Sequence, residues 1–331
     1  MKEFDFIDQL LTPLATDPAA LGLGDDAAIL AAGCGSLVVT KDMLIEGVHF
    51  HANDPPASIA RKSLRVNLSD IAAMGAHPRG YFLGCAWGGA WRDSDLEAFV
   101  AGLAEDQAEF GLALLGGDTT AHDGATIVSI TMIGEAADSA FLPRGGAVAG
   151  DDLYVSGTLG DGWLGLQALV GGRNFGGLSD AERDHVIDRY RLPQPRVALG
   201  RELCGVAHAA IDISDGLIAD AGHLGRRSNC GLEIALDATP LSDAARKWAG
   251  DGVETEKNLL TLARGGDDYE LLFAAPPEKR DAVAAAARSS GVSVTRIGRV
   301  FHGAGVRVLN ESGDALETPF GGYEHMTSGG S

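Results

Sequence analysis

This sequence of 331 residues has few cysteines and no stretch that could cross a membrane. Its four cysteines form no C-x-x-C pair, and each lies in an apolar or glycine-rich context typical of reduced, packed thiols. No run reaches the ~18 apolar residues of a membrane span, and the first residues include acids where a signal peptide would need a basic start. We therefore expect a reducing, cytoplasmic location and no membrane partner.

Basic residues are also scarce, because 26 Lys and Arg stand against 46 Asp and Glu, a net charge of -20. This charge would repel nucleic acid, and no Lys/Arg run supplies a local basic patch. It would also repel a nucleotide, so a phosphate substrate must arrive with cations or meet them in its site. With 45% hydrophobic and 22% charged residues, the chain has the composition of an ordinary globular protein of about two domains.

Several catalytic signatures are missing as well. No G-x-x-x-x-G-K-[ST] occurs, which excludes a P-loop enzyme at the level of motifs. No G-x-S-x-G and no other recognisable nucleophile with its base is present, so covalent catalysis is not indicated. His49 and His51 would project to the same side of a strand, yet no third His or Cys at ligand spacing supports zinc. A hydrogen bond from His49 to a substrate is the favoured interpretation.

What the sequence does contain is aspartate in short clusters. They are Gly24-Asp25-Asp26, Thr40-Lys41-Asp42, Asn67-Leu68-Ser69-Asp70, Gly116-Gly117-Asp118, Asp212-Ile213-Ser214-Asp215 and Gly266-Asp267-Asp268. Mg2+ takes oxygen ligands, typically one or two carboxylates with waters and substrate phosphates, so several clusters indicate several ions and a polyphosphate ligand. One Gly-Asp-Asp alone is more often a turn, and Ser214 with Asp215 could simply cap a helix. Clusters at strand ends, however, can converge on one crevice of an open α/β sheet.

Periodicity predicts two halves that are both α/β, with a boundary near residue 140. In the first half we expect helices over 4–14, from Pro55, and from a capping box at Ser94 to about Phe110, with strands over 27–30, 36–40, 112–115 and 126–133. In the second half, helices alternate with strands over 153–156, 209–211, 232–236, 269–274, 292–300 and 306–309. The predicted domains are 1–140 and 141–326, followed by a tail over 327–331 that is too small and polar to stay ordered.

Six strings taken together resemble the thiamine-monophosphate kinase family, in that family's order across almost the whole chain. They are Gly24 to Ala28, Thr40 to Phe50, Val66 to Ala76, Gly116 to Thr120, Ile211 to Leu217 and Gly266 to Leu271. The resemblance implies a two-domain α/β (α+β) fold of the aminoimidazole ribonucleotide synthetase-like type. It also implies a homodimer whose central barrel-like core is formed by the N-terminal sheets of two subunits.

The same resemblance implies the activity and the residues that carry it. The activity is ATP-dependent, direct in-line transfer of a phosphoryl group to thiamine monophosphate, giving thiamine diphosphate, with several Mg2+ ions and with no catalytic nucleophile or general base. The implied magnesium ligands are Asp26, Thr40, Asp42, Asp70, Asp118, Asp212 and Asp215. The implied ATP contacts are Gly117, Asp118, Arg144 and Ser214. The implied thiamine monophosphate contacts are His49, Asp267 and Phe320.

Two positions depart from the family's pattern. Phe320 stands where the family often has Trp, and Lys41 stands where it commonly has a second hydroxyl residue, which would bring an ammonium close to the phosphates. Two alternatives therefore stay open. One is another ATP-dependent enzyme of the same superfamily that activates an amide, carbamoyl or selenide acceptor. The other is a non-catalytic regulator that binds Mg2+ or nucleotide.

Overall fold

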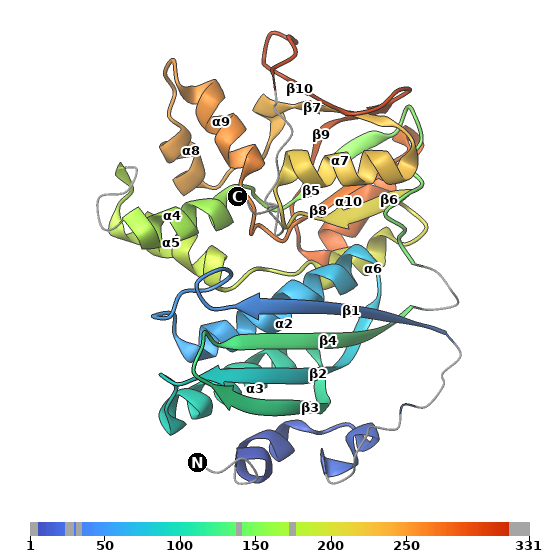
Figure 1. Ribbon diagram of the computed structural model, residues 1–331. Coiled ribbons are helices and arrows are strands. Elements are labelled where there is room, and N and C mark those ends of the chain that lie inside the picture. Colours follow the sequence, from blue (N-terminus) through green and yellow to red (C-terminus); the bar gives the residue numbers. More distant parts are fainter. Residues whose placement is uncertain (1–5, 24–29, 31–34, 137–140, 172–176, 318–331) are drawn as a thin grey trace, which may run out of the picture. The chain divides into compact units, whose positions relative to one another are not determined.

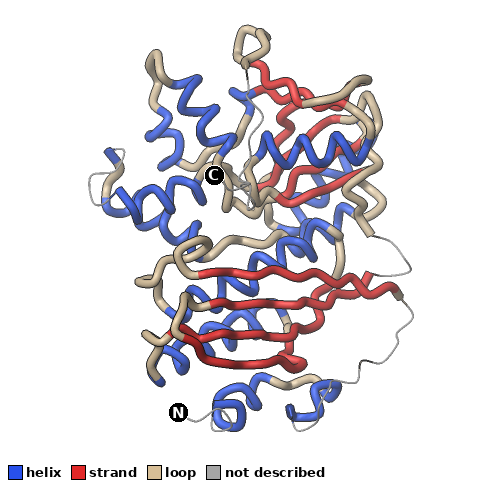
Figure 2. Tube along the Cα trace, viewed as in Figure 1, coloured by secondary structure: helices blue, strands red, loops and turns tan. Residues whose placement is uncertain are grey.

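The computed structural model describes residues 6–23, 30, 35–136, 141–171 and 177–317, the side chains of residues 8 and 21–23 excepted (Figures 1 and 2). The chain divides into two compact units. Unit 1 comprises Met1–Ile71 and Ala76–Phe141, and unit 2 comprises Ala72–Gly75 and Leu142–Ser331. None of the helices in the described residues combines the length and the apolar character that a membrane span requires.

Unit 1 is built on a four-stranded sheet in the order β1-β4-β2-β3. Its strands are β1 Ser36–Ile45, β2 His77–Gly88, β3 Ala113–His122 and β4 Ile127–Ala136. Strand β4 runs antiparallel to β1 and β2, and β3 runs parallel to β2. Its helical segments are η1 Ile7–Leu11, η2 Thr12–Leu14, η3 Pro18–Leu23, α2 Pro56–Ala73 and α3 Asp93–Phe110.

Helices α2 and α3 cover one face of this sheet, here called the inner face (Figure 1). Helix α2 begins at a proline, whose missing N–H costs nothing in a first helical turn. It buries Leu64, Leu68 and Ile71 completely, because their spacing of three or four residues places them on one face of the helix. On the opposite, outer face, β1 exposes Leu37, Val39 and Met43 with 47%, 59% and 51% of their surface accessible.

Several predicted elements of unit 1 differ in the structure. The helix expected over 4–14 is a π turn followed by a 3-10 turn. Strands β1 and β3 continue well past the expected ends at Thr40 and Leu115, because β1 pairs with β4 over its whole length and β3 pairs with β2 as far as His122. The aspartates expected after these strands therefore lie within them. Strand β2 was not predicted at all, although it holds the centre of the sheet.

Unit 2 carries a six-stranded sheet in the order β10-β7-β9-β5-β8-β6. Its strands are β5 Asp152–Ser156, β6 Ala209–Asp212, β7 Gly231–Ala235, β8 Leu271–Ala275, β9 Val294–Phe301 and β10 Val306–Leu309. Its helices are α4 Asp161–Gly171, α5 Asp180–Arg191, α6 Val197–Leu203, α7 Leu217–Ser228, α8 Asp243–Ala249, α9 Thr255–Arg264 and α10 Arg280–Ser290.

Two apolar clusters hold the helices of unit 2 against its sheet. One joins Leu217 and Leu224 of α7 to strand residues such as Val155. The other joins α6 and α10 to strand residues such as Phe273. A third cluster, among α4, α5, α8 and α9, packs beside the sheet. The sheet is thus enclosed, and the turns at its ends are held by buried strands such as β8, whose five residues are all buried.

Candidate metal and nucleotide site

In unit 1, strand β1 and helix α2 bring three of the predicted metal ligands together. Thr40 Oγ1 donates a hydrogen bond to Asp70 Oδ2 at 2.5 Å, and the backbone N–H of Asp42 donates to Asn67 Oδ1 at 3.1 Å. Alternation along a strand puts Thr40 and Asp42 on the same face, here the inner one. Asn67 and Asp70 lie one helical turn apart, so both reach that face from α2.

The electrostatics of this cluster favour a bound cation. Burial, together with the neighbouring Asp70 carboxylate, raises the pKa of Asp42 to about 7. Two carboxylates this close repel each other when both are ionised, and a cation removes that repulsion. The donor atoms are a hydroxyl and two carboxylates, which is the oxygen set that Mg2+ prefers. The residues present therefore fit a hard divalent ion.

Lys41 and Asp118 lie on the other face of the sheet. Lys41 Nζ donates to Ser129 Oγ at 2.6 Å and to Thr131 Oγ1 at 3.4 Å on β4. Asp118 belongs to the same cross-strand row as Ser129, through Gly84 of β2. Lys41 and Asp42 therefore lie on opposite faces of β1, because strand alternation turns the Lys41 side chain to the outer face, and the expected approach of its ammonium to the phosphates stays a prediction.

Gly117, a predicted ATP contact, lies beside β2 in the middle of β3. A Cβ atom on Gly117 would lie only 1.9 Å from the carbonyl oxygen of Leu83, so no larger residue fits there without a shift of the strands. Packing against β2 thus accounts for this glycine, and its backbone is exposed at the edge strand.

In unit 2, the turn between β6 and α7 carries three of the predicted ligands. Strand β6 ends at the buried Asp212, and Ser214 and Asp215 form the turn before α7 begins at Leu217. Gly216 adopts φ +112°, which glycine tolerates best, and a Cβ there would approach the carbonyl oxygen of Arg264 to 2.6 Å. The sequence therefore builds a tight turn that presents oxygen ligands ahead of a helix N-terminus.

Asp220, which sequence reasoning missed, supports this turn from α7. Its Oδ2 accepts hydrogen bonds from the backbone N–H groups of Ser214 and Asp215, at 3.1 and 3.0 Å. Burial, followed by the nearby Asp215 carboxylate, raises the pKa of Asp220 to about 7. One atom each of Asp215, Asp220 and His223 lie within 4.8 Å of one another, a grouping that could hold a cation. The signal in the sequence was an acid in the first turn of the helix that follows the cluster.

The two acids of the second Gly-Asp-Asp string, Asp267 and Asp268, have different surroundings. The backbone N–H of Asp267 donates to the carbonyl oxygen of Ser214 at 2.9 Å, so the predicted substrate contact lies beside the turn between β6 and α7. Asp268 is buried, and its carboxylate accepts from the N–H groups of Gly160 at 2.8 Å and Gly162 at 3.1 Å. The second acid thus anchors the start of α4.

The other predicted site residues have simpler surroundings. His49 lies in a turn after β1, where its Nδ1 accepts from the N–H of Ile45 at 3.0 Å, so the expectation that His49 and His51 share a strand face was wrong. Arg144 is exposed in unit 2, and its charge helps to lower the pKa of His223, after burial and Arg226. Asp26 and Phe320 lie outside the described residues.

Comparison with known proteins places these features in a family. The family described as "AIR synthase related protein, N-terminal domain" matches residues 24–136, and its C-terminal counterpart matches residues 148–309. A thiamine-monophosphate kinase from Caulobacter vibrioides is 44% identical over 321 residues, which are 96% of this chain and 90% of the relative.

Solved structures agree with these matches. The thiamine-monophosphate kinase of Stenotrophomonas maltophilia K279a superposes with a TM-score of 0.83 at 39% identity, over 96% of this chain and 98% of that one. A structure described as "AaThiL complexed with AMPPCP and TMP" superposes with a TM-score of 0.76 at 30% identity, over 98% of this chain and 97% of that one.

Proposed function

The chain belongs to the thiamine-monophosphate kinase family, and on that premise we propose how its own residues perform the family's reaction. It is an ATP-dependent kinase that phosphorylates thiamine monophosphate to thiamine diphosphate. The observation that carries this conclusion is the 44% identity to a thiamine-monophosphate kinase over 96% of the chain. A relative that superposes over 98% of the chain is described as complexed with AMPPCP and TMP.

The proposed magnesium ligands are Asp26, Thr40, Asp42, Asp70, Asp118, Asp212 and Asp215. The contact of Thr40 with Asp70, and the raised pKa of Asp42 beside them, support a cation in unit 1. The Asp212–Asp215 turn, braced by Asp220, supports one in unit 2. When bound, such ions would neutralise the phosphate oxygens and the charge that develops on the leaving nucleotide.

The proposed nucleotide contacts are Gly117, Asp118, Arg144 and Ser214. Arg144 is exposed and always charged, which suits a contact to phosphate oxygens. The proposed contacts to thiamine monophosphate are His49, Asp267 and Phe320. The backbone contact of Asp267 with Ser214 supports a substrate position next to the nucleotide, because it fixes the two residues side by side.

The chemistry needs no general base from the protein. The acceptor is a phosphate monoester whose second pKa is about 6, so it is largely dianionic near neutral pH and can attack directly. What opposes the reaction is the repulsion between two polyanions, and a chain of net charge -20 also repels each of them. Cations held by the acidic clusters would reduce this repulsion, and the remaining residues would orient the two substrates in line. Trapping a phosphorylated side chain during turnover would exclude this direct transfer.

We also infer a homodimer and a cytoplasmic location. Leu37, Val39 and Met43 form an exposed apolar row on the outer face of β1, and such a row favours contact with another copy of the sheet. The three described cysteines, Cys85, Cys204 and Cys230, are not joined in disulfides, which is usual for a reducing compartment.

The first test is ADP release by the purified protein with Mg-ATP, with thiamine monophosphate, free thiamine or no acceptor, and with mass identification of the product. Turnover with the monophosphate, giving thiamine diphosphate, is the expected result. Asp212→Asn should reduce that turnover by about 10²-fold or more, because a removed metal ligand affects charge neutralisation in the transition state. The matched control is Asp237→Asn, an exposed acid in a 3-10 turn that should retain full activity. Nucleotide binding without thiamine diphosphate would instead indicate another acceptor.

A further inference from the structure

Unit 2 contains a polar cavity that shares no residue with the positions proposed above. It has a volume of about 450 Å3. Its wall includes two arginines, three hydroxyl residues and a glycine. They are Gly157, Thr158, Arg189, Arg196, Ser293 and Thr295. The residues that line the cavity within the described part of the chain include no acid, in a protein with a net charge of -20.

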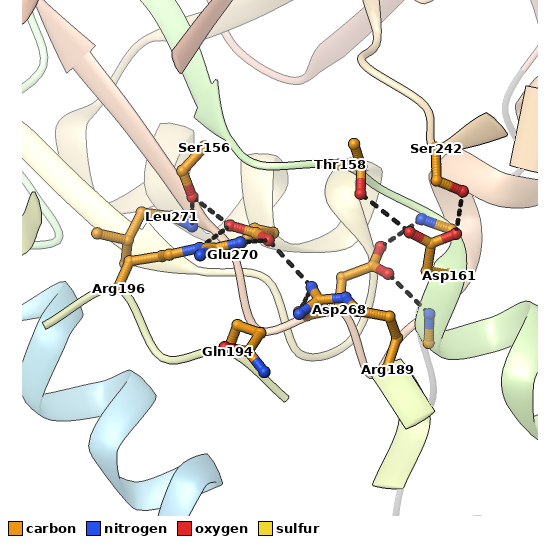
Figure 3. A network of polar contacts seen from close by, with 12 residues as sticks. Ser156, Thr158, Asp161, Arg189, Gln194, Arg196, Ser242, Asp268, Glu270 and Leu271 are labelled. Carbon is orange, nitrogen blue, oxygen red and sulfur yellow. Dashed lines mark hydrogen bonds and ion pairs between the residues drawn. The ribbon is translucent and has the colours of Figure 1, made fainter. Parts of the chain in front are cut away.

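A single buried carboxylate holds both arginines in place (Figure 3). Arg196 donates from Nε and Nη2 to the two oxygens of Glu270, at 2.6 and 2.5 Å, and Arg189 Nη2 donates to Glu270 Oε1 at 3.0 Å. Glu270 is completely buried and also accepts from Ser156 Oγ at 2.6 Å. Two guanidiniums are thus fixed by one carboxylate, which leaves one positive charge in excess.

Several N–H groups of the two arginines donate no hydrogen bond among the described residues. A guanidinium has five N–H groups. Among the described residues, Arg189 donates only from Nη2, to Glu270 and to the carbonyl oxygen of Asp268, and Arg196 donates only from Nε and Nη2. Their side chains are only 11% and 20% exposed, so the remaining N–H groups are largely shielded from bulk water. Such donors are a strong reason to expect an anionic ligand.

We propose that this cavity binds the phosphate group of a small phosphorylated metabolite. Guanidinium groups match phosphate oxygens in geometry as well as in charge. Hydroxyl groups on the cavity wall, at Ser293 and Thr295, supply further polar partners for the same oxygens. The volume exceeds what inorganic phosphate alone would fill, so an esterified phosphate is the expected ligand. The site needs no metal ion, which separates it chemically from the clusters of aspartate.

The test uses the full-length, metal-free protein and follows the backbone N–H signals of the cavity glycines by NMR. The probes are inorganic phosphate, glycerol 3-phosphate, and glycerol without phosphate. Both phosphates should shift the signals of Gly157 and Gly291, the ester more strongly, and glycerol should not. Without metal ions, phosphate binding at the aspartate clusters should be weak, which keeps the two kinds of site distinct.

Two variants locate the binding. Ser293→Glu adds a negative charge at an exposed position on the cavity and should weaken phosphate binding at least about tenfold. Its matched control is Ser312→Glu, the same change at another exposed serine, which should bind as the wild type does. Arg189→Gln leaves the Arg196 pair with Glu270 intact and should weaken binding as well.

Three results would overturn the proposal. The first is no shift of the two glycine signals at about 20 mM phosphate, well above a millimolar dissociation constant. The second is equal binding by Ser293→Glu and Ser312→Glu. The third is a shift confined to the Ser214 and Asp215 signals. None of these measurements depends on kinase activity. If phosphate does not bind in this cavity, the proposed kinase reaction is therefore unaffected.

Discussion

Single residues decide whether the turn between β6 and α7, the proposed metal site of unit 2, keeps its shape. Asp220 is the main example, because its carboxylate accepts from two consecutive backbone N–H groups of that turn while it is itself buried. The cluster Asp212–Asp215 could be found from the sequence, since its residues are neighbours. Asp220 could not, because an acid in the first turn of a helix usually only complements the helix dipole.

Replacing Asp220 with alanine should therefore damage both stability and activity. Two part-buried N–H groups would lose their acceptor, which costs about 1 kcal/mol each. The turn would also relax, and small misplacements of catalytic groups can lower kcat/KM by about 10²-fold. Asp220→Asn keeps one acceptor oxygen and should fall between the wild type and Asp220→Ala. Denaturant unfolding and steady-state kinetics measure the two effects, and wild-type kcat/KM in Asp220→Ala would contradict the role.

Asp268 predicts a pH dependence of stability. Burial raises its pKa to about 8, although the N–H groups of Gly160 and Gly162 oppose this, whereas its ordinary value is 3.8. Between these values the unfolded chain releases the proton and the folded chain retains it. The contribution of Asp268 to stability is therefore present at low pH and decreases as the pH rises towards 8.

Asp268→Asn cannot titrate, so it isolates this contribution. The difference in unfolding free energy between the wild type and Asp268→Asn should be larger at about pH 5 than at about pH 8, by roughly 3–4 kcal/mol. Urea unfolding of both proteins at the two pH values measures it, and all other titrating groups cancel in the difference. A gap that stays constant would show that the Asp268 carboxylate is already ionised in the folded protein at about pH 5.

Whole elements were predicted well where a periodic pattern and an end signal coincide. Helix α2 begins within one residue of its expected start, and β10 has its predicted bounds. Strand β2 was missed because its sequence, His77–Gly88, contains proline and several glycines, which are rare in strands. Pairing with β4 and β3 on its two sides holds it extended despite that composition. Such non-local pairing is not visible in a local pattern.

The start of α3 shows the same limit and can be tested. The capping box expected at Ser94 is not the one that forms, because the helix begins at Asp93 and the N–H of Arg92 donates to Asp95 Oδ2 at 2.9 Å. Asp95→Ala should lower the unfolding free energy by about 1 kcal/mol. The neighbouring Ser94→Ala is the matched control and should change it little. Thermal or urea unfolding decides, and a larger loss in Ser94→Ala would restore the sequence interpretation.

At the scale of the molecule, two of the proposed metal ligands in unit 1, Asp42 and Asp118, are too far apart to bind the same ion within one chain. Asp42 lies on the inner face of β1, whereas Asp118 lies on the outer face of β3. These strands are the two edges of the sheet, three interstrand spacings or roughly 14 Å apart. The sequence interpretation assumed that clusters at strand ends converge, and the continuation of β1 and β3 through their clusters removes that assumption.

If both aspartates serve one reaction, they must therefore come from different subunits of the proposed dimer. This can be tested by co-expressing Asp42→Asn and Asp118→Asn chains with different tags. Each variant alone should be inactive. In a mixed dimer, one of the two sites would combine an intact Asp42 with an intact Asp118, so an equal mixture should recover about a quarter of wild-type activity.

If both aspartates instead acted within their own chain, every site in that mixture would lack one of them and no activity would return. Recovery should also disappear when Val39→Glu is added to both chains, because a charge in the exposed apolar row of β1 would oppose the packing of two sheets. Sedimentation of the Val39→Glu protein shows whether the dimer is lost. Recovered activity in dimers that persist despite Val39→Glu would show instead that the outer face of β1 is not the surface through which the two copies pack.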